Sequence, residues 1–341
     1  MTRWQEAAQR VRDGLSRRIV GMDDVIEKVL LCILTRNHAL LVGVPGLAKT
    51  LLISSLAEVL DLSFARIQFT PDLMPTDITG TEVLAEDKTA NLRTFRFLPG
   101  PIFANLLLAD EINRTPPKTQ SALMEAMEER QVTSVGKRYP LPDPFFVLAT
   151  QNPIDMEGTY PLPAAQLDRF MFRIRIEYPD EEVERRVARR TSRAPVEPLG
   201  PVLTAKDIAD FGTEVAAVTM PDDLRGRIVN FVRRTRPDEP GAPQFVRDWV
   251  AFGASPRAAQ ALGVGSRARA LLCGRTKVTI DDVVALAPAI VRHRLVLNYH
   301  AIAEGIRAVN VVRRLMKDEF ATRDETGVEA APSFWSRLLG G

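Results

Sequence analysis

A phosphate-binding loop is the strongest chemical signal in the chain. Residues 43–50 follow the pattern G-x-x-x-x-G-K-[S/T], except that Ala48 stands where the second glycine is expected. An apolar run at 39–42 precedes the loop, and Leu51–Leu60 carries apolar residues at helical spacing. A loop between a strand and a helix presents backbone N–H groups and a positive helix end to a phosphate. Taken alone, the motif also fits a plain Gly/Pro turn.

The side chains of this loop have distinct expected tasks. Lys49 would reach the β- and γ-phosphates of a nucleotide, and the Thr50 hydroxyl would ligate Mg²⁺. The residues expected to contact the nucleotide are Gly43, Val44, Pro45, Gly46, Leu47, Ala48, Lys49, Thr50 and Leu51.

Polar residues follow two later apolar runs. Asp110 and Glu111 come directly after 105–109, and Asn152 follows 145–149. Ligands bind at the carboxyl ends of parallel strands, so Asp110 is placed to hold Mg²⁺ beside Thr50. Glu111 could polarise an attacking water, and Asn152 could hydrogen-bond that water or the γ-phosphate. A solvated acidic loop and a turn-forming asparagine before proline are the alternatives.

The elements that must position these residues form an α/β domain. Five short apolar runs predict a parallel five-stranded sheet buried on both faces, with helices such as Leu51–Leu60 and Lys118–Arg130 between the strands. The predicted strands are Ala39–Val42, Phe64–Phe69, Asn105–Ala109, Phe145–Ala149 and Met171–Ile176. The connections at 81–97 and 131–145 alternate around polar tips and predict two β-hairpin inserts.

The pattern changes after Pro179. We predict that the α/β domain spans 1–178, and that a linker helix and a Pro-rich linker occupy 179–203. Residues 204–318 show only helical patterns and predict an all-α lid domain, in which Thr279–Asp282 resembles a capping box. Residues 319–341 form a C-terminal segment of mixed character.

Composition restricts the class of protein. The 341 residues are 45% hydrophobic and 26% charged, which is typical of a globular protein. Formal net charge is only +2, which argues against a protein that coats nucleic acid. We expect a cytoplasmic protein without a transmembrane segment, because no signal core or spanning stretch is present. The two cysteines and three histidines are scattered, so the only metal predicted is Mg²⁺.

The motifs together resemble the MoxR family of AAA+ ATPases. The resemblance rests on Gly43–Thr50, 106–114, 116–129, 149–153 and 166–170, and on 253–258 and 293–294 in the helical part. It covers about residues 15–300. The family typically carries alanine at the position of Ala48, whereas the acid it commonly has before the 166–170 motif is replaced by Ala164 and Ala165.

This resemblance implies roles for single residues. Gly43–Thr50 would be the Walker A loop, and Asp110 and Glu111 would be Walker B. Asn152 would be sensor 1, and Arg257 would be sensor 2, projecting from the lid onto the phosphates. Arg169 would be an arginine finger that reaches the neighbouring subunit's nucleotide. Val20 and Gly21 lie where such folds contact adenine, and Arg114 could face the subunit interface.

The resemblance also implies partners. It suggests ATP and Mg²⁺ as ligands, a homo-oligomer in the form of a hexameric ring, and a partner with a von Willebrand factor A domain. The expected function is ATP hydrolysis by a chaperone that remodels or assembles client proteins, with the two hairpins facing the pore or the client.

Three alternatives remain open at this point. They are the ATPase subunit of a metal chelatase, a nucleic-acid-associated motor, and a nucleotide-dependent adaptor with low turnover. Net charge near zero counts against the motor, and the combination of Asp110, Glu111, Asn152 and Arg169 counts against the adaptor. Use of GTP is not expected, because no Asn-Lys-x-Asp segment follows the fourth strand.

Overall fold

The computed structural model describes residues 2–87, 92–154, 158–189 and 198–320. Its centre is a five-stranded sheet with the order β2-β5-β8-β1-β9, in which all neighbouring strands are parallel. This confirms the predicted sheet, and every predicted run overlaps its strand. The strands are β1 (Ala39–Val42), β2 (Phe64–Gln68), β5 (Leu106–Asp110), β8 (Phe146–Gln151) and β9 (Phe172–Arg175).

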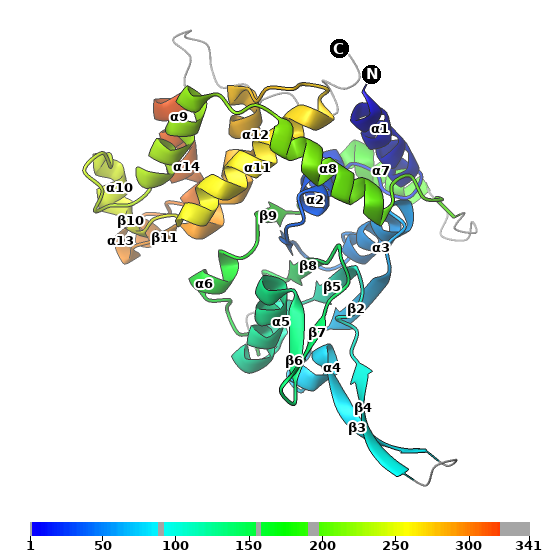
Figure 1. The fold of residues 1–341 in the computed structure, drawn as a ribbon. Coiled ribbons are helices and arrows are strands. Elements are labelled where there is room, and N and C mark those ends of the chain that lie inside the picture. Colours follow the sequence, from blue (N-terminus) through cyan, green and yellow to red (C-terminus); the bar gives the residue numbers. More distant parts are fainter. Residues whose placement is uncertain (1, 88–91, 155–157, 190–197, 321–341) are drawn as a thin grey trace.

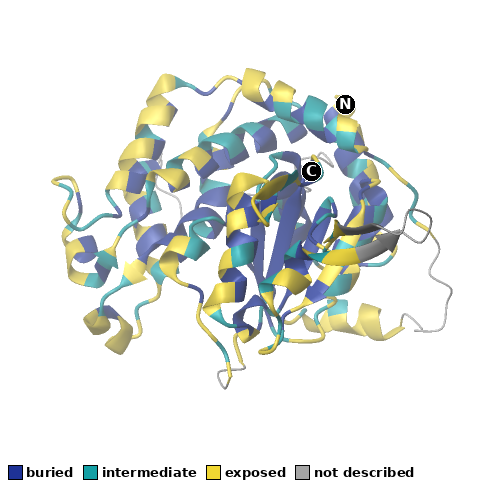
Figure 2. Ribbon diagram, turned by 60° about the horizontal axis from the view of Figure 1, so that its bottom comes forward, coloured by how far each residue is buried: buried dark blue, intermediate teal, exposed yellow. Residues whose placement is uncertain are grey.

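Both faces of the sheet are covered by helices. Successive strand residues point to opposite faces, so Leu41 and Leu148 join one core cluster while Leu40 and Ala149 join another. This double burial explains why the central strands β1, β5 and β8 are mainly apolar and buried, as the dark blue strands of Figure 2 show, whereas the edge strands β2 and β9 include arginines and are partly exposed. The first cluster includes α1 (Arg3–Ser16), α2 (Asp23–Leu34) and α3 (Lys49–Val59), and the second includes α5 (Pro117–Glu129).

Two β-hairpins extend from this domain and confirm the predicted inserts. One pairs β3 (Gly80–Asp87) with β4 (Leu92–Pro99), and it projects away from the body in Figure 1. The other pairs β6 (Gln131–Ser134) with β7 (Lys137–Pro140). The rings of Phe97 and Tyr139 stack with centroids 4.0 Å apart and join the two hairpins. Toward the end of the long hairpin, Phe95 is 72% exposed and Leu84 54% exposed. The predicted polar tip at 86–88 extends into 88–91, outside the described residues.

The C-terminal half is mainly helical but differs from the all-helical prediction in one respect. A short antiparallel pair joins β10 (Val250–Phe252) to β11 (Val296–Leu297). Strands of two or three residues are too short to show a period, which is why the sequence pattern missed them. The predicted capping box is confirmed, since the backbone N–H of Thr279 donates to Asp282 Oδ2 at 2.9 Å.

The remaining elements complete the chain order. Between the strands of the first half lie α4 (Pro75–Thr79), η1 (Ile112–Arg114) and α6 (Ala164–Leu167). The second half contains α7 (Glu181–Arg189), α8 (Ala205–Ala217), α9 (Asp222–Arg233), α10 (Gln244–Trp249), α11 (Pro256–Leu272), α12 (Ile280–Val291), η2 (Arg292–Arg294), α13 (Tyr299–Ala303) and α14 (Ala308–Phe320). The proline-rich linker lies partly in 190–197, and most of the predicted C-terminal segment lies in 321–341, both outside the described residues.

The helical half packs directly on the N-terminal helices. Trp4 of α1 meets Phe211 of α8 edge to face with centroids 4.8 Å apart, and its indole N–H donates to Glu214 Oε2 at 2.7 Å. A single core cluster runs through α1, α2, α11 and α12. The lid is therefore fixed to the α/β domain along one face of the sheet. No helix among the described residues is long and apolar enough to cross a membrane.

Candidate functional site

The loop between β1 and α3 has the backbone that a phosphate-binding turn requires. A Cβ on Gly43 would lie 2.8 Å from the carbonyl oxygen of Ile176, whereas a Cβ on Gly46 would meet nothing within 4 Å. Ala48 has φ 50° and ψ 23°, which is the left-handed conformation that glycine adopts without strain. Holding a side chain there costs about 1 kcal/mol. The substituted residue therefore keeps the backbone shape that the glycine of the general pattern would provide.

A cavity of about 2400 Å³ lies along this loop. Its opposite wall comes from the segment before α2 and from α12, including Ile280 and Val284. The predicted nucleotide-contacting residues that line it are Val20, Gly21, Gly43, Val44, Gly46, Leu47, Ala48 and Leu51. Pro45, Lys49 and Thr50 belong to the same loop but are not part of this lining. The structure thus brings the predicted adenine segment and the phosphate loop to one space.

Position 21 requires a glycine, both for its backbone conformation and for the space around it. Its φ is +73°, and an added Cβ would stand 2.5 Å from a methyl carbon of Val183 on α7. Both the conformation and the close approach therefore favour glycine. This contact places the segment at 19–21 against the linker helix and shapes the far side of the cavity.

The loop fits a phosphate group. Within the described part of the chain, no acceptor meets the backbone N–H groups of Val44, Gly46, Leu47 or Ala48. Peptide N–H groups grouped at the start of a helix suit an anion. Lys49 Nζ donates to the carbonyl of Gly43 at 2.5 Å. Burial lowers the pKa of Lys49, and attraction to Asp110 and Glu111 partly opposes that effect, so its ammonium group lies in the field of both acids.

The two acids at the end of β5 share a hydrogen-bonded cluster. Thr150 of β8 donates from Oγ1 to Asp110 Oδ1 at 2.5 Å and accepts the backbone N–H of Glu111 at 2.8 Å. Arg66 of β2 donates to Asp110 Oδ2 at 2.7 Å. The cluster lies at the carboxyl ends of adjacent strands, where the sheet order predicts that ligands bind.

Glu111 is held by two further side chains. Its Oε2 accepts from Arg114 Nη1 at 2.9 Å and from Gln68 Nε2 at 3.2 Å. Its own backbone has φ 56°, so the residue that follows the strand turns sharply. The carboxylate is therefore oriented by neighbours from β2 and η1, and predicted interface residue Arg114 contacts Glu111 within the same subunit.

Asn152 lies beside this cluster, immediately after β8. It is buried, with 3% exposed, and its Oδ1 accepts the backbone N–H of Ile154 at 3.1 Å. That bond is the turn-forming contact expected of an asparagine before proline. Its position next to Thr150 also keeps it at the edge of the sheet that carries the acids.

Arg169 and Arg257 lie together and away from the cavity lining. Arg169 forms an ion pair with Glu128 of α5 and donates to the carbonyl of Met124 at 2.8 Å. Arg257, in the first turn of α11, donates to the other oxygen of Glu128 at 2.8 Å. The predicted arginine finger and the predicted sensor 2 thus meet at one carboxylate, and neither residue lines the cavity that the phosphate loop forms.

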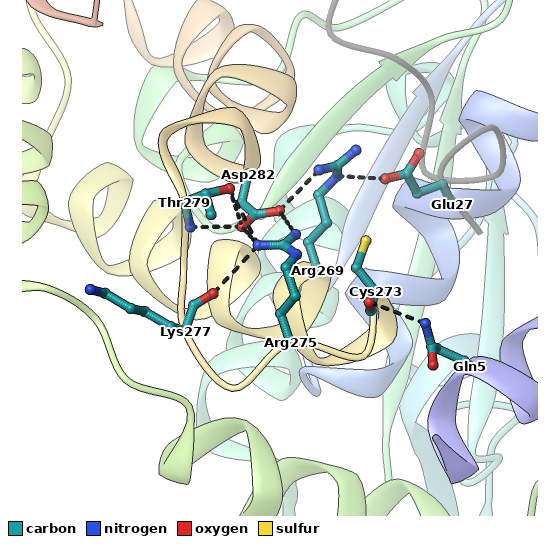
Figure 3. Close-up of polar contacts among 8 residues, drawn as sticks. All are labelled: Gln5, Glu27, Arg269, Cys273, Arg275, Lys277, Thr279 and Asp282. Carbon is teal, nitrogen blue, oxygen red and sulfur yellow. Dashed lines mark hydrogen bonds and ion pairs between the residues drawn. The ribbon is translucent and has the colours of Figure 1, made fainter. Parts of the chain in front are cut away.

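A second ionic cluster, drawn in Figure 3, borders the cavity through Glu27 and Arg269, and all of its members are buried except Arg275, which is 29% exposed. Arg269 of α11 donates to Glu27 of α2 at 2.9 Å and to Asp282 of α12 at 3.0 Å. Arg275 also donates to both oxygens of Asp282, at 2.6 and 2.7 Å. Burial is the largest single influence on the pKa of Arg269 and lowers it, but attraction to Glu27, Cys273 and Asp282 together outweighs burial, so the pKa is raised. This cluster joins the α/β domain to the lid.

The histidines have structural positions. Burial lowers the pKa of His38 to about 4, and its Nδ1 accepts the backbone N–H of Val147 at 2.9 Å. His293 is buried against the carbonyl of Phe170, with a pKa lowered by the same desolvation. His300 is exposed and near Glu304. Among the described residues, no group of three or more His, Cys, Asp or Glu side chains is arranged to hold a metal.

Sequence reasoning missed several residues of these clusters. Arg66 and Gln68 were not identified, and Thr150 was noted only within the motif at 149–153, because these residues come from strands that only the sheet order brings together. Glu128 was noted only as part of the motif at 116–129, because its two arginine partners come from distant parts of the chain.

Comparisons with known proteins cover both halves of the chain. Residues 38–172 match the sequence profile described as "ATPase family associated with various cellular activities (AAA)", and residues 245–315 match the AAA lid domain. The chain is 44% identical over 303 residues to Chaperone MoxR1 of Mycobacterium tuberculosis, which covers 89% of this chain and 79% of that protein. It is 30% identical over 338 residues to Protein MoxR of Methylorubrum extorquens, covering 94% and 96%. The crystal structure of a candidate ATPase from Cytophaga hutchinsonii is similar with a TM-score of 0.85 and 41% identity, covering 92% and 94%.

Proposed function

The chain belongs to the MoxR family of AAA+ ATPases, and from that premise we propose that it hydrolyses ATP with Mg²⁺ at sites shared between subunits of a ring. One observation carries the proposal most directly. The phosphate loop, with its open N–H groups, lies at the same edge of the sheet as the cluster of Asp110, Glu111 and Thr150.

The residues of the chain divide the work of phosphoryl transfer between them. Backbone N–H groups of Val44 and of residues 46–50 would bind the phosphates, and Lys49 would neutralise charge on the β- and γ-phosphates. Glu111 would orient the attacking water and accept its proton. Gln68 and Arg114 hold that carboxylate in place, and Asn152 would fix the water or the γ-phosphate from the neighbouring strand. Catalysis here is mainly positioning, which the hydrogen-bonded cluster supports.

The acids and the loop hydroxyl also fit a magnesium ion. Thr50 and Asp110 supply hard oxygen atoms, the ligand type that Mg²⁺ takes, and the ion would neutralise charge between the phosphates. Asp110 is 9% exposed, and one of its oxygens faces Arg66, whose side chain is 47% exposed. Arg66 would have to share that oxygen with the hydration shell of the ion or swing outward, and its exposure leaves room for this movement.

Arg169 and Arg257 support a site completed by a second subunit. They lie together at Glu128, and their side chains are 28% and 46% exposed. Two arginines exposed on the surface of one subunit can reach the nucleotide that a neighbouring subunit binds. There, a guanidinium group stabilises the charge of phosphoryl transfer. Both arginines would therefore act in trans, from one face of the subunit.

Action on protein clients is the remaining part of the proposal. The long hairpin carries Leu84, Phe95 and Leu98 on its surface, all more than half exposed. Exposed apolar side chains of this kind favour contact with other proteins. We place the hairpins toward the pore or the client of a hexameric ring. A partner with a von Willebrand factor A domain and a cytoplasmic location are further parts of this proposal, and nucleic acid is not expected as a partner.

ATP hydrolysis measured against protein concentration tests the shared site. We expect specific activity of the wild type to rise with concentration and to fall at least 100-fold in Arg169→Ala, because a trans arginine is worth roughly 10³–10⁵ in rate. Glu111→Gln should retain nucleotide binding and assembly while hydrolysis is lost. Wild-type activity that is independent of concentration and survives Arg169→Ala would rule out the shared site.

A further inference from the structure

Glu128 receives two arginines from separate parts of the fold. Arg169 comes from the turn before β9, and Arg257 comes from the first turn of lid helix α11. They occupy different oxygens of one carboxylate, Oε2 and Oε1 respectively. The side chains of Arg169, Arg257 and Glu128 are 28%, 46% and 43% exposed. Two positive charges and one negative charge therefore share a half-exposed patch with a net positive charge.

The position of Glu128 is unfavourable without these partners. It lies in the last turn of α5, where the helix dipole presents its negative end, and the basic C-cap residue Arg130 donates instead to the carbonyl of Arg36 at 2.8 Å. A carboxylate at this end is normally destabilising. Its charge is therefore supported from outside the helix, by the two arginines.

The backbone around the arginines is held from behind. Asp168 accepts from Arg294 Nε at 2.7 Å and from Ser255 Oγ at 2.8 Å, and Ser255 is the N-cap residue of α11. Arg294 is buried and also donates to the carbonyl of Phe170 at 2.8 Å. The turn that carries Arg169 and the helix end that carries Arg257 are thus tied to each other, whereas the two guanidinium groups reach the surface. These hydrogen bonds would therefore remain if the two guanidinium groups released Glu128 and bound another anion.

We infer that Glu128 is an internal substitute for the phosphate that Arg169 and Arg257 bind on the neighbouring subunit. The inference rests on the proposed function. A guanidinium fork matches a carboxylate and a phosphate in the same way, so one anion can replace the other. In the free subunit Glu128 keeps the two cations together and neutralises part of their repulsion. On assembly, the neighbour's nucleotide phosphate, which carries more negative charge, displaces it, so Glu128 opposes assembly when nucleotide is absent.

Sedimentation velocity with Mg²⁺ and a slowly hydrolysed ATP analogue tests this inference without relying on turnover. Glu128→Gln keeps the size of the side chain and removes the competing charge. We expect its assembly midpoint to fall by roughly two- to tenfold in protein concentration, the range set by the loss of two exposed ion pairs. The matched control is Glu129→Gln on the same helix, because Glu129 is exposed and has no ion pair among the described residues. Its midpoint should equal that of the wild type.

The outcomes separate this inference from the function on which it rests. If Glu128 had a purely structural role, Glu128→Gln would lower the melting temperature and leave the assembly midpoint unchanged or raised. An unchanged or a raised midpoint would overturn the proposal that Glu128 substitutes for a phosphate. In an Arg169→Ala background the effect of Glu128→Gln should shrink, because one of the two competing contacts is already gone. A wild type that never assembles with the analogue would instead reject the shared site, and the inference with it.

Discussion

Two clusters of arginine and carboxylate side chains occur in this molecule, and their surroundings differ. In the cluster of Figure 3, the central Arg269 is 1% exposed and its partners Glu27 and Asp282 are 6% and 0% exposed, whereas Arg275 at the edge of the cluster is 29% exposed. At Glu128, all three charged side chains are more than a quarter exposed. Buried charges cannot change partner without severe loss, whereas half-exposed ones can. From this difference we infer that the interior cluster holds the lid in place, whereas the arginines of the surface cluster can exchange Glu128 for an anion of a neighbouring subunit.

Asp282→Ala should have the largest effect, because it removes the carboxylate shared by Arg269 and Arg275 in the interior. Breaking a buried ion pair on one side typically costs about 3–5 kcal/mol. The free energy of unfolding, measured by urea titration, should fall by about that amount. A loss below 1 kcal/mol would show that water reaches the cluster and would remove the contrast between the two regions.

As the pH falls, protonation of buried imidazoles should destabilise the protein before the carboxylates of the interior ion cluster are protonated. The pKa of His38 is lowered to about 4 by burial, with a smaller contribution from Arg130, whereas an unfolded histidine titrates near 6.5. The unfolded chain therefore binds a proton that the folded chain excludes, and stability falls as pH drops from 6.5 to 4. The total loss from His38 is about 3 kcal/mol.

His293, whose pKa is also lowered, adds to this loss in the same direction. Burial raises the pKa of Asp282, but the hydrogen bonds from Arg275 and Thr279 and the attraction to Arg275 and Arg269 together outweigh burial and hold the pKa below its ordinary value, so that carboxylate stays charged throughout the same pH window. Urea titrations at pH 7 and pH 4.5 check this, and His38→Gln should show a smaller difference between them. An equal difference in that variant would assign the acid response to other groups.

Glu128→Ala should have the smallest effect on stability. Exposed ion pairs contribute about 0.2–1 kcal/mol each, and removal of an acid from the negative end of α5 offsets part of that loss. The free energy of unfolding should change by less than about 1 kcal/mol. A loss similar to that of Asp282→Ala would mean that the surface cluster is structural, against the comparison drawn above.

The parts predicted from the sequence are those that local spacing determines. Gly43, Lys49 and Thr50 belong to one short segment, so their relation is fixed within a few residues, and the central strands β1 and β5 are mainly apolar runs. The contacts of Thr150 with Asp110 and of Arg269 with Glu27 join residues far apart in the chain. Their pairing depends on strand order and helix packing, which side-chain types alone do not reveal. The β10–β11 pair was missed because its strands are too short for a pattern.

The strand order also determines when the phosphate loop can form during synthesis. β1 precedes the loop, but its neighbours are β8 and β9, and Ala39 pairs with Leu148 and Phe172. Until the ribosome has released the chain through β8, β1 has no partner in the sheet and is open to aggregation, and its second neighbour arrives only with β9. Such distant parallel pairing is slow to form. Nucleotide binding by a nascent chain would therefore indicate that the whole sheet has closed.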